Sequence, residues 1–182
     1  MSRYTIHKEK WQACTLCNLC ERRKRVVLCR GKLPAPILFV GEAPGPSEDI
    51  LGIPFVGPAG KLLDQIISRT IDGQWDYAMT NLVACIPKGE DNTKFAEPPP
   101  EAIKACEPRL EELLFMCNPK LIIAVGELAN KWLPKMQVMD WMWTGAFVCI
   151  THPAAILRAD IMQRGLLIQR CIATLEDALE VL

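Results

Sequence analysis

The most constraining stretch of this chain is residues 41–60, GEAPGPSEDILGIPFVGPAG. Its five glycines and four prolines are too much special backbone for a plain connection. Glycine permits close approach of a ligand, and proline fixes φ and stiffens a loop. An apolar run at residues 37–40 precedes the loop and predicts a buried strand, and a one-sided apolar pattern after it predicts a helix. A rigid loop from strand to helix is where an α/β protein holds its site.

Strands and helices are predicted to alternate along the rest of the chain. Further strands are expected at residues 76–83, 121–125 and 147–150, and helices at 103–117, from Glu127 and at 168–182. This alternation predicts a three-layer α/β/α sandwich with a central four-stranded parallel sheet. At 182 residues the chain is expected to be one domain, residues 1–182.

Local details of this pattern carry three expectations. A helix over residues 8–20 would carry Cys14, Cys17 and Cys20, and a turn is expected at Gly31. Pro108 should kink its helix or leave Cys106 just before the helix begins.

Composition narrows the class of protein. The 21 basic and 21 acidic residues cancel, which argues against a protein that coats nucleic acid by bulk charge. The polar residues 1–11 do not read as a secretory signal, and no run approaches the roughly 18 apolar residues of a membrane span. We therefore expect a cytoplasmic protein that does not engage membranes.

Four distinctive residues stand where the predicted strands end: Glu42, Asn81, Gly126 and His152. The carboxyl ends of parallel strands share one edge of a sheet, where ligands bind. We therefore expect these positions to converge on one cleft. A nucleotide phosphate loop is excluded at residues 57–61, because Phe55 stands where that motif needs glycine and Leu62 where it needs Ser or Thr.

The nine cysteines point to a metal or cluster, because a disulfide framework is not expected in a reducing compartment. Cys14 and Cys17 form a Cys-x-x-Cys pair, whose two thiolates reach one metal. Iron–sulfur clusters take four thiolates, and zinc accepts the same ligands. Cys20 and Cys29 compete for ligand roles, whereas Cys117, Cys149 and Cys171 are expected in the core.

Several motifs together resemble family 4, the iron–sulfur uracil-DNA glycosylases. The similar segments are residues 14–19 with 25–27, 41–45 with 48–49 and 52–60, 81–85, and 152–158. The resemblance covers residues 14–158. It implies a 4Fe-4S cluster on Cys14, Cys17, Cys85 and Cys106, with zinc as the less favoured occupant, and therefore an N-terminal cluster-binding segment.

An extruded uracil must be stacked, hydrogen-bonded on its edge and released as an anion. Phe55 offers a π-face, with a core residue as the alternative. Asn81 offers an acceptor and a donor suited to N3–H and O4, with a turn or cap as the alternative. His152 is suited to donate to uracil O2, unless backbone groups simply satisfy it.

The remaining expected site residues surround that pocket. Glu42 would orient or deprotonate water or stabilise a cationic sugar, or else cap the loop; Glu48 competes for the chemical role. Backbone amides of residues 41–45, including Gly41 and Ala43, are expected to face the base or a phosphate. The resemblance implies a wedge at Leu157, which fills the space of the flipped base, and a phosphate contact at Arg158.

The chain departs from the family's pattern in three respects. Ala84 and Ile86 replace a basic pair beside the third cysteine, Ala154 replaces a frequent serine, and the loop at 88–100 is longer. The Trp- and Met-rich segment 132–143 is either a satellite core or a docking patch for a replication or repair protein.

The pattern as a whole favours a monofunctional uracil-DNA glycosylase that acts on uracil-containing DNA and leaves an abasic site. The alternative is a glycosylase-fold subunit that binds DNA or a replication partner with little or no catalysis. A pure iron–sulfur redox protein would leave the convergence of Phe55, Asn81 and His152 unexplained.

Overall fold

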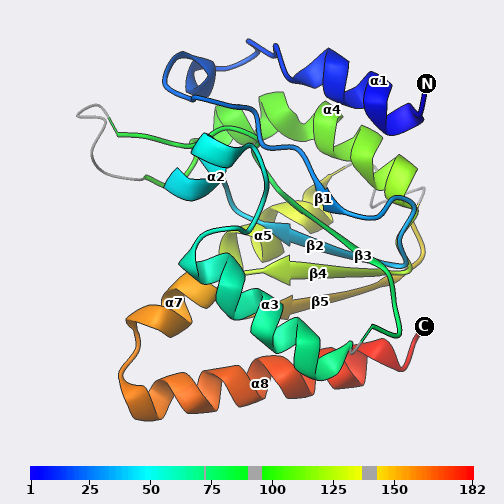
Figure 1. The fold of residues 1–182 in the computed structure, drawn as a ribbon, viewed down its shortest axis with the longest axis vertical. Helices are drawn as coiled ribbons and strands as arrows, with labels where there is room; N and C mark the ends of the chain where they lie inside the picture. The colour runs from blue at the N-terminus through cyan, green and yellow to red at the C-terminus, as the bar shows by residue number, and fades with distance from the viewer. Residues whose placement is uncertain (72, 90–95, 137–142) are drawn as a thin grey trace.

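The computed structural model describes residues 1–71, 73–89, 96–136 and 143–182. A five-stranded sheet runs through its centre in the order β1-β3-β2-β4-β5 (Figure 1). The strands are β1 (Arg30–Gly31), β2 (Ile37–Gly41), β3 (Tyr77–Asn81), β4 (Leu121–Val125) and β5 (Ala146–Ile150). Strands β3, β2, β4 and β5 are parallel, and β1 is antiparallel to β3.

The four predicted parallel strands are confirmed. The candidate at 76–83, which was expected to end near Asn81, is β3, and it ends at Asn81. The turn expected at Gly31 is wrong, because Arg30 and Gly31 pair with Met79 and Ala78 as the edge strand β1. Two residues are too few to show a strand's alternation, so no sequence pattern pointed to this strand.

Helices cover both faces of the sheet, which confirms the three layers (Figure 1). On one face lie α1 (Arg3–Trp11), α4 (Pro100–Cys117), α5 (Glu127–Trp132) and the 3₁₀ turn η2 (Leu133–Lys135); on the other lie α3 (Pro58–Thr70), α7 (Pro153–Arg158) and α8 (Ile161–Leu179). Successive side chains of β2 point to opposite faces of the sheet, so they enter two separate cores. Leu38 and Val40 pack with α4 and α5, and Ile37 and Phe39 pack with α3 and α8.

The helix expected over residues 8–20 is wrong. Helix α1 begins after Ser2, whose hydroxyl accepts from the Thr5 amide, and it ends at Trp11. Cys14 and Cys17 follow in irregular chain, and Cys20 lies in the 3₁₀ turn η1 (Asn18–Glu21). Cys14 already donates its backbone amide to the Trp11 carbonyl in a turn, so the chain leaves the helical path before the first thiol.

Helix α4 runs through Pro108 without ending there. Proline stands at its first position, Pro100, where a missing N–H costs no helical hydrogen bond. The alternative in which Cys106 precedes the helix is therefore wrong, since Cys106 lies well inside it. This places the Cys106 thiol on a rigid element.

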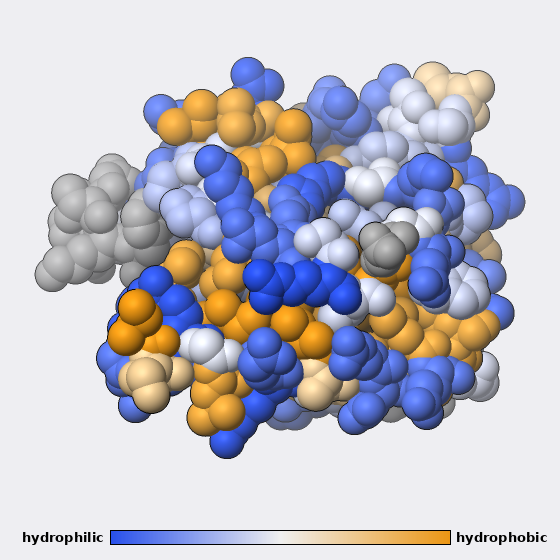
Figure 2. Space-filling model, turned by 60° about the horizontal axis from the view of Figure 1, so that its bottom comes forward, coloured by the Kyte–Doolittle hydropathy of each residue, from blue (hydrophilic) through white to orange (hydrophobic). Residues whose placement is uncertain are grey.

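The outer face of α8 is mixed in polarity. Ile161, Met162 and Leu166 are exposed there, and this side of the molecule shows apolar patches interrupted by polar side chains (Figure 2). Among the described parts of the chain, none of the helices has the length and apolarity needed to cross a membrane.

Candidate active site

The parallel strands end in register, so their following loops emerge at one edge. Gly41 pairs with Asn81, and Val125 pairs with Ile150. Ladder-like bonds continue one step further, since the Leu82 amide donates to Gly41 and the Gly126 amide to Ile150, both at 2.9 Å. The expected convergence of the strand ends is therefore present at the level of the backbone.

Gly41 lies between the side chains of Phe55 and Asn81. A Cβ atom on Gly41 would stand 2.6 Å from Phe55 Cζ and 2.5 Å from Asn81 Oδ1. Both side chains are buried, with exposed fractions of 6% and 3%. The structure thus brings an aromatic ring and an amide together around one position that has no side chain.

His152 follows β5 at the same edge and forms the N-cap of α7. Its Nδ1 accepts from the Ala154 amide at 3.1 Å, so a neutral ring carries its proton on Nε2. Its ring packs against Gly126, whose Cβ would stand 2.9 Å from the histidine Cβ. Burial, and then the charge of Arg158, lowers the pKa of His152, which favours the neutral donor.

Glu42 directly follows β2 and is half-buried. Its carbonyl accepts from the Val83 amide at 3.2 Å, which ties this loop to the chain leaving β3. Burial, and then the nearby carboxylate of Glu97, raises the pKa of Glu42. Ala43, also half-buried, packs against the core below α4 and α5.

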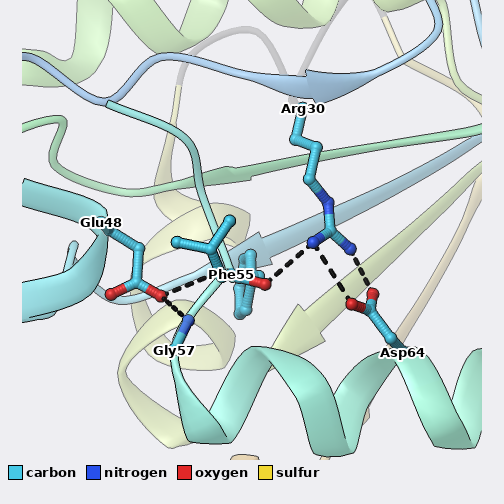
Figure 3. Close-up of polar contacts among 6 residues, drawn as sticks. Arg30, Glu48, Phe55, Gly57 and Asp64 are labelled. Carbon is cyan, nitrogen blue, oxygen red and sulfur yellow. Dashed lines mark hydrogen bonds and ion pairs between the residues drawn. The ribbon is translucent and has the colours of Figure 1, made fainter. Parts of the chain in front are cut away.

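Glu48 is buried in the short helix α2 (Pro46–Leu51) and organises the glycine- and proline-rich loop. Its Oε1 accepts from the amides of Val56 at 2.9 Å and Gly57 at 2.8 Å (Figure 3). Its partners are therefore backbone groups of the loop that presents Phe55.

Leu157 and Arg158, the expected DNA contacts, close helix α7 beyond His152. Leu157 is half-buried against the core under α8, and Arg158 is exposed. The charge of Arg158 acts on His152, so the two side chains belong to one electrostatic environment.

The four expected cluster ligands, Cys14, Cys17, Cys85 and Cys106, line one pocket. A single small pocket is lined by five thiols, from Cys14, Cys17, Cys20, Cys85 and Cys106, together with the side chains of Trp11, Arg23 and Arg109. Within the described ranges, no three His, Cys, Asp or Glu side chains are close enough to form a ready metal site. The donor chemistry nevertheless fits zinc or an iron–sulfur cluster, because five cysteine side chains line this pocket and thiolates are ligands of both. Cys29 lies elsewhere, packed against the core of α4.

Known proteins of similar sequence identify the family of this chain. The sequence profile of the Uracil DNA glycosylase superfamily matches residues 30–176. A type-4 uracil-DNA glycosylase of Pyrobaculum aerophilum is 35% identical over 80% of this chain and 80% of its own length. The type-4 uracil-DNA glycosylase of Thermotoga maritima is 32% identical over 84% of this chain and 82% of its own. The chain belongs to the type-4 uracil-DNA glycosylases.

A solved structure supports the fold of this family member. The SMUG2 protein of Pedobacter heparinus superposes with a TM-score of 0.62, over 80% of this chain and 76% of its own. At 14% identity, the similarity speaks for the fold alone.

One buried arginine of this type-4 chain was not predicted from the sequence. Arg109 is 1% exposed, and its guanidinium donates to Thr80 Oγ1 at 2.8 Å and to the carbonyls of Asn81 at 2.5 Å and Leu82 at 2.9 Å. It thereby fixes the end of β3 from α4. The only sequence signal was a charge at the inward spacing of an amphipathic helix, which a solvated face also produces.

The Trp- and Met-rich segment falls largely on residues 137–142, which lie outside the described residues. Trp143 Nε1 donates to the Pro119 carbonyl at 2.7 Å, and Trp132 and Trp143 both pack against the core. These two tryptophans fit the satellite-core alternative.

Proposed function

We propose that this protein is a monofunctional uracil-DNA glycosylase, which extrudes uracil from DNA and hydrolyses its N-glycosidic bond. The observation that carries the proposal is the close approach of the Phe55 ring and the Asn81 amide to each other at Gly41, where only a glycine fits. The identity to type-4 uracil-DNA glycosylases along most of the chain supports the same activity.

The chemistry follows from what the flanking groups offer. Phe55 stacks on the base, and the Asn81 amide accepts from N3–H and donates to O4. The neutral His152 ring donates from Nε2 to O2 as negative charge builds on the departing base. Glu42 orients the attacking water or stabilises the cationic sugar, and the product is an abasic site. Because the reaction is hydrolytic, it needs no lysine nucleophile.

On the DNA side, Leu157 fills the space of the extruded base and Arg158 contacts a phosphate. Glu48 contributes through the loop that carries Phe55, and Gly41 and Ala43 contribute backbone to the pocket. The chain acts as one domain in this proposal. A replication or repair protein docking on segment 132–143 belongs to the same proposal as a second partner.

The activity test is release of free uracil from an oligonucleotide with one uracil, using anaerobically purified protein. Wild type should release uracil and leave an alkali-labile site, whereas Asn81→Ala and His152→Ala should each lose about 10²–10³-fold in rate. The same oligonucleotide with thymine is the substrate control. Absence of uracil release from wild type would reject the enzyme and favour the DNA-binding alternative.

We also propose that Cys14, Cys17, Cys85 and Cys106 hold a 4Fe-4S cluster. Such a cluster would serve as a structural crosslink between the N-terminal segment and the β3–α4 region. Arg23 supports this assignment, because it donates to Cys85 Sγ at 3.4 Å and would offset thiolate charge.

Iron and sulfide analysis tests the cofactor separately from activity. Cys17→Ser and Cys106→Ser should lose iron and the brown visible absorbance, whereas Cys171→Ser, buried in the opposite core, should keep both. Cys20→Ser tests whether Cys20 is a ligand. The variant should keep its iron if the four named cysteines hold the cluster, and lose it if Cys20 takes the place of one of them. If the wild-type protein contains stoichiometric zinc and no iron, the cysteines hold zinc and the cluster proposal is rejected.

A further inference from the structure

The backbone of Phe55 adopts a conformation that side chains rarely take. Its φ is 55°, in the left-handed region, although Phe55 is not a glycine. Such a residue persists only where its surroundings hold it, and functional sites are where this occurs. Gly60 and Arg30 meet the backbone of Phe55 directly. Glu48 holds the two amides that follow Phe55, and Asp64 holds Arg30.

On the side after Phe55, Glu48 holds the next two amides, those of Val56 and Gly57 (Figure 3). Gly60 closes on Phe55 from helix α3. A Cβ atom on Gly60 would stand 2.0 Å from the Phe55 carbonyl oxygen, so that oxygen occupies space that only glycine leaves free. The loop therefore packs directly against α3, the helix that follows it.

On the opposite side, Arg30 reaches across from the edge strand β1. Its Nη1 donates to the Phe55 carbonyl at 2.9 Å and to Asp64 Oδ2 at 3.3 Å, and its Nη2 pairs with Asp64 Oδ1 (Figure 3). Asp64 lies on α3, one turn beyond Gly60. A two-pronged pair with a carboxylate fixes the plane of a guanidinium, so the direction of the third hydrogen bond is fixed as well.

We propose that Arg30 and Asp64 are positioning residues that set the ring of Phe55 against Gly41 and thereby shape the base pocket. The pair acts through Phe55, and the proposal rests on the glycosylase function proposed above. Arg30 holds the backbone of Phe55. The ring of Phe55 would stand 2.6 Å from a Cβ atom on Gly41, and the Asn81 amide approaches the same position. A rotation of that backbone would therefore move the stacking face relative to the amide that reads the base.

Removal of this pair should leave the fold intact. The side chains of Arg30 and Asp64 are 24% and 41% exposed, and ion pairs near the surface contribute little to stability. Lys32 and Asp76 provide a matched control. They form a 2.8 Å ion pair just beyond the same edge strand, at 74% and 52% exposure, and no described contact joins that pair to Phe55.

The first test is a double-mutant cycle in the uracil-release assay. Arg30→Met should lower kcat/KM by about tenfold, because a small misplacement of a binding group costs much of its effect. Arg30→Lys should recover part of the loss, and Lys32→Met should change kcat/KM less than twofold. In a Phe55→Leu background, Arg30→Met should add nothing. Equal losses in both backgrounds would overturn the proposal, since Arg30 would then act independently of the ring.

The second test does not need activity. The chain has five phenylalanines, so 4-fluorophenylalanine labelling gives five fluorine resonances, and Phe55→Leu identifies the one from Phe55. Arg30→Met and Asp64→Asn should shift or broaden that resonance and leave the other four unchanged, while Lys32→Met alters none. A Phe55 resonance that does not move in these variants would overturn the proposal that Arg30 and Asp64 position the ring. Failure of wild type to release uracil, with the resonance moving as expected, would reject the glycosylase function alone.

Discussion

At the residue scale, the proton of His152 has a defined position. The Ala154 amide points at Nδ1, so adding a proton there would break the N-cap hydrogen bond of α7. Burial and the Arg158 charge oppose that proton too. A histidine held in this way donates through Nε2 while remaining neutral.

We therefore expect His152 to titrate below the ordinary histidine range of about 6.5. Arg158→Gln should raise its pKa, because a positive neighbour disfavours the cationic ring, whereas the pKa of His7 should not change. NMR titration of the two imidazoles checks this, with His152→Asn identifying the resonance. An unshifted pKa in Arg158→Gln would contradict this electrostatic reading.

Glu42 offers a second pH prediction. Since Glu97 is the second cause of its raised pKa, Glu97→Gln should lower that pKa part of the way, leaving the effect of burial. If ionised Glu42 supports catalysis, the acid limb of kcat/KM moves to lower pH. The pH–rate profile measures this, and Glu101→Gln, also exposed, is the control. A limb that stays in place would assign it to another group.

Residue identities could be predicted better than residue contacts. Glycine and proline density marked the loop, and strand ends marked Asn81 and His152. The carboxylate of Glu48 could not be matched in advance to the Val56 and Gly57 amides, because that contact depends on how the loop folds back. The same holds for Arg30, whose partners are 25 and 34 residues away.

At the scale of elements, α4 fastens the end of β3 through Arg109. Arg109→Met should leave the Thr80 hydroxyl and two carbonyls without their charged donor, at a cost of about 3 kcal/mol, which lowers the melting temperature by about 6–12 °C. Arg170→Met, on the exposed surface of α8, should leave it within about 2 °C. Equal melting temperatures for both variants would show that the guanidinium carries no net stability.

Two glycines inside helices should respond in opposite directions. Gly60→Ala drives a methyl into the Phe55 backbone at 2.0 Å and should destabilise the protein. Gly165→Ala, with nothing within 4 Å of the new methyl in α8, should stabilise it by about 0.5–1 kcal/mol. Thermal melts of the pair check this, and a stable Gly60→Ala would mean that the loop moves away without loss.

Elements with strong patterns were predictable and short or irregular ones were not. Apolar runs located β2, β4 and β5. The segment carrying Cys14 and Cys17 was mistaken for helix, because ligand spacing and helical spacing overlap over so few residues. Strand β1 has only two residues and draws its pairing from β3.

At the scale of the whole molecule, the parallel sheet made the convergence of the strand ends predictable, since it brings distant loops to one edge. The position of the N-terminal segment was not predictable, because it depends on tertiary contacts. Glu112 on α4 gathers three groups of α1: His7 Nδ1 at 3.1 Å, Trp11 Nε1 at 2.6 Å, and Lys10 Nζ.

Between that anchor and β1, Leu19, Val27 and Leu28 are buried, whereas residues 22–25 between them are held by polar contacts. Arg22 Nη1 donates to the Gly89 carbonyl at 2.6 Å, and the Lys24 amide donates to Asp49 at 2.7 Å. Removing the iron of the proposed cluster with a chelator should therefore make residues 22–25 the first tryptic cleavage site, seen by mass spectrometry. Cleavage at α8 first, at Arg170, would contradict a crosslinking role for the cluster.

The bare α-carbon of Gly41 has a consequence for how such a protein could be silenced. The ring of Phe55 and the amide of Asn81 already crowd this α-carbon, so an alanine methyl group there would force at least one of them out of position. Glycine and alanine codons differ by one nucleotide. A variant whose proposed pocket has a displaced ring or amide therefore lies a single base change away.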